Sequence, residues 1–215
     1  MQLLLNRKSV MKYTLDTQAA RQANTTGRIT ETGAYTGIFT KAKKVVSQKG
    51  VIGIEFSFKD EFDNSADYLT VWTVSKDGNQ TYGYKQLMAL MTCLRLNEIA
   101  SQSGLVEEYD SVAKQAINVS AEVYPALMNK QIGVLLQAEE YEKSTGEIGQ
   151  RMNLFGFFDA ASRLTAVEIL DKKTSPEVLD KMLGSMQPIK KLKNTKQAGV
   201  QVNSSNFDNE IPSWV

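Results

Sequence analysis

The stretch Val51-Ile-Gly-Ile-Glu-Phe-Ser-Phe58 has the most regular pattern in this chain of 215 residues. Apolar side chains alternate along it with small or polar ones, Ile52, Ile54, Phe56 and Phe58 on one side and Gly53, Glu55 and Ser57 on the other. A period of two residues is typical of a half-buried β-strand, because successive side chains point to opposite faces of a sheet. Residues 51–58 therefore predict a strand with one face in the core.

Further strands are expected on both sides of this one. Residues 34–46 alternate small or apolar residues with aromatic or basic ones, and residues 47–50 supply a turn. After an acidic loop, residues 67–75 alternate again. The Asp77-Gly78 pair then favours a tight turn and a short hairpin extension over residues 81–84.

The pattern next changes to helical spacing. In residues 85–100 apolar side chains recur every three to five positions, which predicts one amphipathic helix. Residues 107–121 are interpreted as a second helix. Strand alternation returns in residues 131–141 and again in residues 151–159.

Beyond these strands the chain is expected to end in a helical extension and a tail. Residues 163–170 fit either a sixth strand or a helix. Ser175-Pro176-Glu177 predicts the start of a short helix to Leu183, with serine as the cap and proline in the first turn. From Gln187 the chain becomes basic, then polar.

Three strands, a helix and two more strands are the element order of an OB fold, a partly open Greek-key barrel. We therefore expect a mainly β protein with helices (α+β): a five-stranded OB-type barrel with a helix between strands 3 and 4. Residues 33–187 would form this domain, after a basic polar arm over 1–32. Residues 188–215 would be a disordered linker and an acidic tip.

The composition excludes several classes of function. The chain has no histidine and one cysteine, so the commonest general base and the usual zinc ligands are missing. Cys93 lies in an apolar stretch and is expected to be a buried thiol. No apolar run is long enough for a membrane span. We expect no enzyme activity, no metal or cofactor, and a cytoplasmic location.

The charges are unevenly distributed. Residues 1–50 hold 9 basic and 2 acidic residues, whereas residues 51–129 hold 5 and 11. An anion-binding part and an acidic part are therefore expected instead of a uniformly neutral surface.

Aromatic and basic side chains on the expected strands exceed what a barrel of this size needs for its core. Binding a single nucleic-acid strand without sequence preference requires such a combination, with cations along the phosphates and aromatic rings on which bases stack. An alternative is that the rings are core and the lysines only protect an edge strand. The candidate contacts are Tyr35, Phe39, Lys41, Lys43, Lys44, Lys49, Tyr68, Trp72, Tyr82, Tyr84, Lys85, Arg151 and Phe155.

The C-terminal sequence Asn206-Phe-Asp-Asn-Glu-Ile-Pro-Ser-Trp214 resembles the acidic tip of bacterial single-stranded DNA-binding proteins. It departs from that pattern in having fewer carboxylates, Trp214 in place of a phenylalanine, and Val215 after it. The resemblance implies that the tip binds replication or recombination proteins. The residues concerned are Phe207, Asp208, Glu210, Ile211, Pro212 and Trp214.

The body of the chain is similar to single-stranded DNA-binding proteins of tailed bacteriophages, through residues 33–38, 51–58, 68–72 and 83–94. This resemblance implies a monomer or homodimer in the host cytoplasm that coats single-stranded DNA in phage replication, recombination or repair. The alternative is a phage accessory or structural protein that acts through protein contacts and binds no DNA.

Overall fold

Strand β1 (Gly33–Val46) is the centre of the sheet in the computed structural model, which describes residues 13–17, 27–110 and 112–192. The C-terminal half of β1 pairs with β2 (Ile52–Asp60), and β2 pairs with β3 (Ser65–Val74). Every strand pair is antiparallel. These three strands confirm the first three that the sequence predicts.

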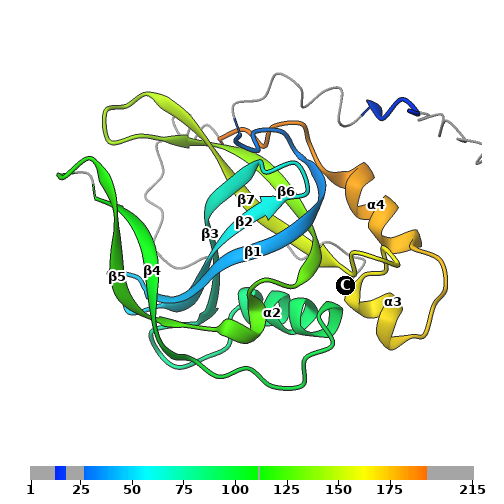
Figure 1. The fold of residues 1–215 in the computed structure, drawn as a ribbon, viewed down its shortest axis with the longest axis horizontal. Coiled ribbons are helices and arrows are strands. Elements are labelled where there is room, and N and C mark those ends of the chain that lie inside the picture. Colours follow the sequence, from blue (N-terminus) through cyan, green and yellow to red (C-terminus); the bar gives the residue numbers. More distant parts are fainter. Residues whose placement is uncertain (1–12, 18–26, 111, 193–215) are drawn as a thin grey trace, which may run out of the picture.

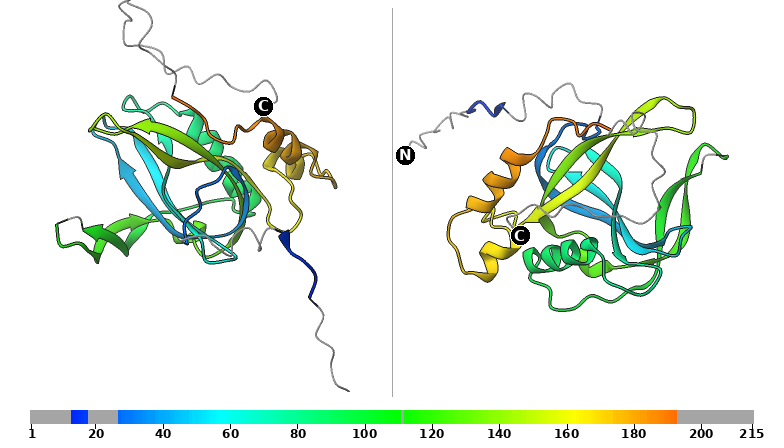
Figure 2. Two further views of the ribbon diagram at one scale, coloured as in Figure 1. Left: turned by 90° about the horizontal axis from the view of Figure 1, so that it is seen from above. Right: turned by 180° about the vertical axis from the view of Figure 1, so that it is seen from behind.

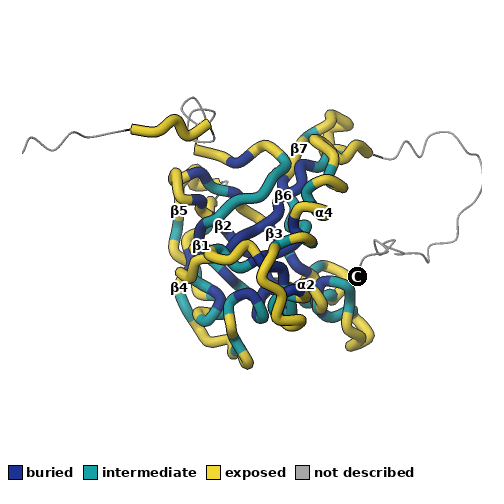
Figure 3. The backbone as a smooth tube through the Cα atoms, turned by 90° about the vertical axis from the view of Figure 1, so that its right-hand side faces the viewer, coloured by how far each residue is buried: buried dark blue, intermediate teal, exposed yellow. Residues whose placement is uncertain are grey.

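The N-terminal half of β1 pairs with β6 (Gln131–Glu142), and β6 pairs with β7 (Ile148–Phe158). These are the fourth and fifth predicted strands. Each inner strand turns an alternating or continuous apolar run towards the interior, as the burial of β2 and β6 along the chain shows (Figure 3).

A second hairpin, β4 (Gln102–Asp110) and β5 (Gln115–Val123), stands where the sequence analysis expected a helix over 107–121. That expectation is wrong. Val106, Ile117 and Val119 alternate towards one face of the hairpin, and β-branched residues at a period of two favour a strand over a helix. The hairpin joins β1 at a single register pair, Lys43 with Val123, and projects from the body (Figures 1 and 2).

Helix α2 (Tyr82–Cys93) begins and ends earlier than the predicted 85–100. Its start leaves no strand over 81–84. The predicted hairpin extension is confirmed only as a shorter one, in which Gln80 pairs with Val74 and the Thr81 amide bonds to the Thr73 carbonyl oxygen. The backbone of Gly83 lies so close to the Trp72 carbonyl oxygen that no Cβ would fit there. The helix ends because Arg95 adopts a left-handed conformation with a φ of 57°. The amides of Arg95 and Leu96 then donate hydrogen bonds to carbonyl oxygens of the last helical turn.

The C-terminal extension is helical and covers the β6–β7 side of the molecule (Figure 1). Residues 163–170 resolve as the short helix α3 (Ala166–Leu170), and the predicted helix after Pro176 is confirmed as α4 (Glu177–Ser185). Glu168 is buried and accepts hydrogen bonds from the amides of Thr165 and Val178, which ties α3 to α4. A 3-10 turn, η1 (Pro125–Leu127), precedes β6.

The core lies between the sheet and α2. Phe39, Phe56, Phe58 and Phe157 form its aromatic centre, with the rings of Phe39 and Phe56 only 4.5 Å apart. Ile29 is also buried there, and Lys190 bonds to the edge of β6. The domain's contacts therefore include residues on both sides of 33–187.

The protein is mainly β with few helices, and its sheet has seven strands instead of the five expected. Omitting the β4–β5 hairpin, the strand path is β3-β2-β1-β6-β7. No backbone pairing joins β3 to β7 within the residues that the structure describes, so the sheet is not closed. Helix α2 contacts both of these edge strands.

Candidate nucleic-acid interface

The candidate interface is the outer face of β1, β2 and β3, which turns away from the core. It is defined here by Lys41, Lys43, Glu55, Tyr68 and Trp72. The register sets Lys43 opposite Glu55 and Glu55 opposite Thr70, while Trp72 lies opposite Gly53. Side chains at paired positions share one face of a sheet, so these residues from three strands form one surface.

Trp72 has an exposed ring, and its backbone is held by a hydrogen bond. Its side chain is 38% exposed, and its carbonyl oxygen accepts a hydrogen bond from the Thr81 hydroxyl. The indole lies over Gly53, where an added Cβ would come within 2.8 Å of the ring carbon Cε3. The glycine therefore provides the room in which the ring packs against β2.

Tyr68 is the second exposed ring, 64% accessible to solvent. It lies in a β-bulge, because β3 has one more residue than β2 between the pairs Phe56–Leu69 and Phe58–Ala66. Its φ of 60° is unusual for a bulky residue. The ammonium of Lys41 lies 5.6 Å from the centroid of the Tyr68 ring, a cation–π contact. Such backbone strain is common at binding sites.

The lysines of β1 are paired with carboxylates. Lys41 and Lys43 lie 3.1 and 3.4 Å from Glu55 Oε1, although neither contact has hydrogen-bond geometry. Lys43 also binds Glu108 of β4, and Lys44 lies 2.7 Å from Glu122 of β5. These cations are therefore partly neutralised by the protein itself.

The pKa of Lys43 reflects this pairing. Burial opposes the charged form, but the hydrogen bond and negative charge of Glu108 and the charge of Glu55 outweigh it, so the pKa is raised. The hydrogen bond to Glu122, with that group's charge, likewise raises the pKa of Lys44. Both ammonium groups are charged at neutral pH.

Phe39 is not on this face, and its assignment as a nucleic-acid contact is wrong. Its ring is fully buried against Phe56. The cause is a β-bulge at Thr40, where β1 has one more residue than β2. An extra residue reverses which side chains face the core, so Phe39 and Ala42 point inward and Lys41 and Lys43 outward.

Tyr35 also lies before the bulge and belongs to the core side. It is half-buried against the main cluster, and its hydroxyl donates to the Glu31 carbonyl oxygen at 2.8 Å. Burial, with the nearby charges of Glu31 and Asp60, raises its pKa to about 12. The ring therefore packs against the core and does not belong to the outer face of the sheet.

The remaining predicted contacts are spread over other elements. Lys49 is exposed in the turn between β1 and β2, and Lys85 is exposed on α2. Tyr82 and Tyr84 are half-buried in the first turn of α2, and burial raises the pKa of Tyr82. In the part of the chain that is described, neither Lys49 nor Lys85 forms an ion pair.

Arg151 and Phe155 do not share a face, contrary to the prediction. Arg151 is exposed, pairs with Glu139 at 3.5 Å and lies over the Tyr141 ring. Phe155 is the extra residue of a bulge in β7 and packs with the smaller cluster around Leu179. The bulges at Thr40 and Phe155 account for the errors of orientation among the predicted strand contacts.

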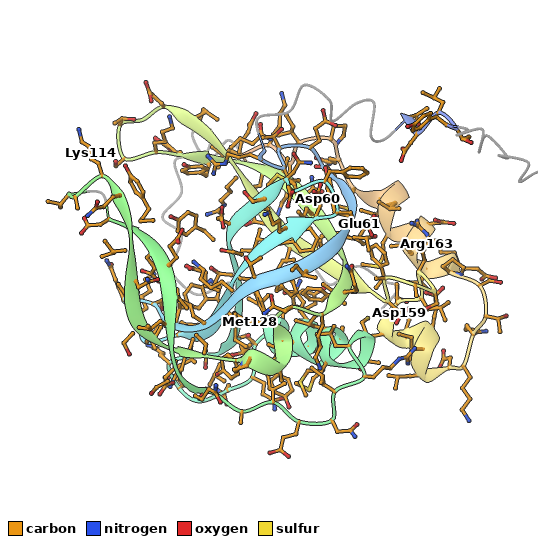
Figure 4. The ribbon with its side chains drawn as sticks, in the orientation of Figure 1. Asp60, Glu61, Lys114, Met128, Asp159 and Arg163 are labelled. Atoms are coloured by element: carbon orange, nitrogen blue, oxygen red, sulfur yellow. The ribbon has the colours of Figure 1, made fainter. Side chains whose placement is uncertain are left out.

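The acidic loop between β2 and β3 has a structural role. Asp60 is buried, and its Oδ1 accepts hydrogen bonds from the amides of Phe62 and Asn64. Figure 4 shows Asp60 and Glu61 well away from Lys114, which lies at the tip of the β4–β5 hairpin. Across the described ranges, no three cysteine or acidic side chains gather as a metal site would require.

Sequence reasoning missed the carboxylates of the interface. Glu55 was recognised as outward-facing on β2, but its partners were not, and Glu108 and Glu122 were assigned to the second helix or its end. The predicted tip, Phe207 to Trp214, lies outside the described residues. None of the helices described has the length and apolarity needed to cross a membrane.

The comparisons with known proteins identify no relative. No protein-family model matches this sequence, and no curated protein matches it significantly.

Proposed function

We propose that this protein binds single-stranded DNA without sequence preference and coats it during phage replication, recombination or repair. The observation that carries the proposal is the pair of exposed rings, Tyr68 and Trp72, on one sheet face next to the lysines of β1. Bases stack on such rings whatever their sequence, and lysines attract the phosphates.

The strand path supports an OB-type barrel as the scaffold of this function. The order β3-β2-β1-β6-β7, with α2 after β3 and against both edge strands, agrees with an OB fold that carries the β4–β5 hairpin as an insertion. OB folds bind oligonucleotides through a strand face of this kind. Fold alone does not specify function, so the argument depends on the rings and lysines.

A second candidate, a phage accessory or structural protein without DNA binding, is favoured by the β4–β5 hairpin. Leu105 and Tyr109 on its outward face and Val112 at its turn are 74%, 62% and 91% exposed. Exposed apolar groups of this kind can mark a protein contact.

Titration with labelled oligo(dT) at 50 and 200 mM salt separates the two functions. A single-strand binder loses affinity as salt rises, with a log–log slope of about −0.7 per phosphate contacted. Trp72→Ala and Tyr68→Ala should each weaken binding by about 1 to 3 kcal/mol, roughly 5- to 150-fold. Tyr109→Ala is the matched control, because it removes an equally exposed ring from the hairpin and should leave affinity unchanged.

Two outcomes of this titration would contradict the proposal. No binding of the unmodified chain to oligo(dT) at 50 mM salt would exclude the function. Equal losses in Tyr68→Ala and Tyr109→Ala would show that the outer face is not the site.

We further propose that the acidic tip recruits partner proteins and is not part of the DNA site. A chain that ends at residue 205 should bind oligo(dT) as tightly as the full chain or more tightly, because acidic groups compete with phosphates for cations. Weaker binding by the shortened chain would place the tip in the DNA site instead.

A further inference from the structure

Two carboxylates neutralise the lysines of the proposed interface. Glu55 is shared by Lys41 and Lys43, and Glu108 binds Lys43. A carboxylate and a phosphate offer a lysine the same partner, an anionic oxygen acceptor. A DNA strand that uses Lys43 therefore competes with a carboxylate for its ammonium group.

Glu108 comes from a hairpin that pairs with the body at one end. The β4–β5 hairpin meets β1 at the register pair Lys43–Val123, and the amide of Tyr124 just beyond it bonds to the Ala42 carbonyl. Further along the hairpin, Glu108 forms an ion pair with Lys43 of β1. Glu108 lies near the turn end of β4, opposite Ile117, whereas Gln102 at the other end of β4 pairs with the anchoring Val123.

The hairpin directs Glu108 and its neighbour Glu107 to opposite faces. Glu108 points towards Lys43, and its side chain is 34% exposed. Glu107 is exposed on the other face, opposite Asn118, and has no ion pair among the described residues. The two residues carry the same charge on the same strand, but only one of them can compete at the lysines.

We propose that Glu108 is an internal competitor for phosphate, so that the β4–β5 hairpin limits DNA affinity until a bound strand displaces it from Lys43. The inference rests on the proposed function and adds regulation of the same face. Displacement costs the ion pair but leaves the hairpin anchored at Val123. Stacking on Tyr68 and Trp72 then decides whether a strand remains bound.

The test compares Glu108→Gln with Glu107→Gln in oligo(dT) titrations at 50 and 200 mM salt. Releasing Lys43 from Glu108 leaves it only the Glu55 charge that it shares with Lys41, and the one phosphate contact that it can then make steepens the log–log salt slope by about 0.7. The affinity of Glu108→Gln should therefore rise by roughly fivefold to tenfold at 50 mM salt and by about threefold at 200 mM. Glu107→Gln should change affinity less than twofold, since it removes the same charge without freeing a lysine.

A structural role of the ion pair gives the opposite result. If Glu108 only holds the hairpin in place, Glu108→Gln will bind DNA as the unmodified chain does or more weakly, and the inference is overturned. An equal gain in both variants overturns it too, because it would report net charge. If neither the unmodified chain nor the variants bind oligo(dT) at 50 mM salt, the proposed function itself fails.

A fold check and a second variant keep the test valid if Glu108→Gln misfolds. Thermal unfolding followed by circular dichroism checks that Glu108→Gln keeps its fold. Should that variant unfold, Glu108→Ala repeats the test at Lys43, because it also removes the charge that pairs with this lysine. A gain in affinity with a steeper salt slope supports the inference, and no gain overturns it.

Discussion

The β4–β5 and β6–β7 hairpins are the same kind of element with opposite relations to the core. β6 pairs with β1 at six positions, from Gly33 opposite Leu136 to Ile38 opposite Gln131, whereas β5 pairs with β1 at one. In β6 every residue from Ile132 to Ala138 is buried. In the β4–β5 hairpin only Val106 and Val123 are.

The two hairpins differ because of what lies on their two faces. The β6 strand has the main core on one face and α4 on the other, where Leu135 packs with Leu179 and Met182. The β4–β5 hairpin has no such cover, and Glu107 and Glu108 place a carboxylate on each of its faces. One hairpin therefore stabilises the fold, while the other is free to carry contacts that change on binding.

The largest expected difference between the hairpins is in stability. Leu135→Ala removes a fully buried side chain between β6 and α4 and should lower the free energy of unfolding by about 2 to 5 kcal/mol. Leu105→Ala, the same substitution at an exposed site on β4, should change it by less than about 0.5 kcal/mol. Urea denaturation with the slope compared between variants measures both. Similar losses in the two variants would contradict the division of roles.

The parts of the fold that were predictable from the sequence are the ones whose pattern follows from burial. Ile54, Phe56 and Phe58 alternate with other residues because one face of β2 lies in the core. The run of β6 is continuously apolar because both of its faces are buried. The hairpin residues have no core to face. They combine helix-forming residues such as Glu107 and Glu108 with a period of two in Val106, Ile117 and Val119, and the helix prediction over 107–121 was wrong.

The site was predictable in part for a related reason. The outward orientation of Trp72 and Tyr68 follows from the alternation of β3, and the structure confirms it. The inward turn of Phe39 was not predictable, because the bulge at Thr40 depends on pairing with β2. The partner of Lys43 was hidden for the same reason, since Glu108 lies 65 residues away in an element that was taken for a helix.

The smallest expected effect concerns the Lys43–Glu108 pair as a stabilising contact. Because the folded protein raises the pKa of Lys43 above its ordinary value of 10.5, the pair stabilises the fold fully below that pH. This contribution is lost as pH rises through the raised pKa. Glu108→Gln should therefore lower the free energy of unfolding by about 1 kcal/mol or less at pH 7 to 10, and the difference should shrink above pH 10.5. Denaturation curves of both proteins across this range measure it. A loss of several kcal/mol at pH 7 would mean that the pair holds the β4–β5 hairpin as firmly as packing holds β6–β7, and that a bound strand could not displace it.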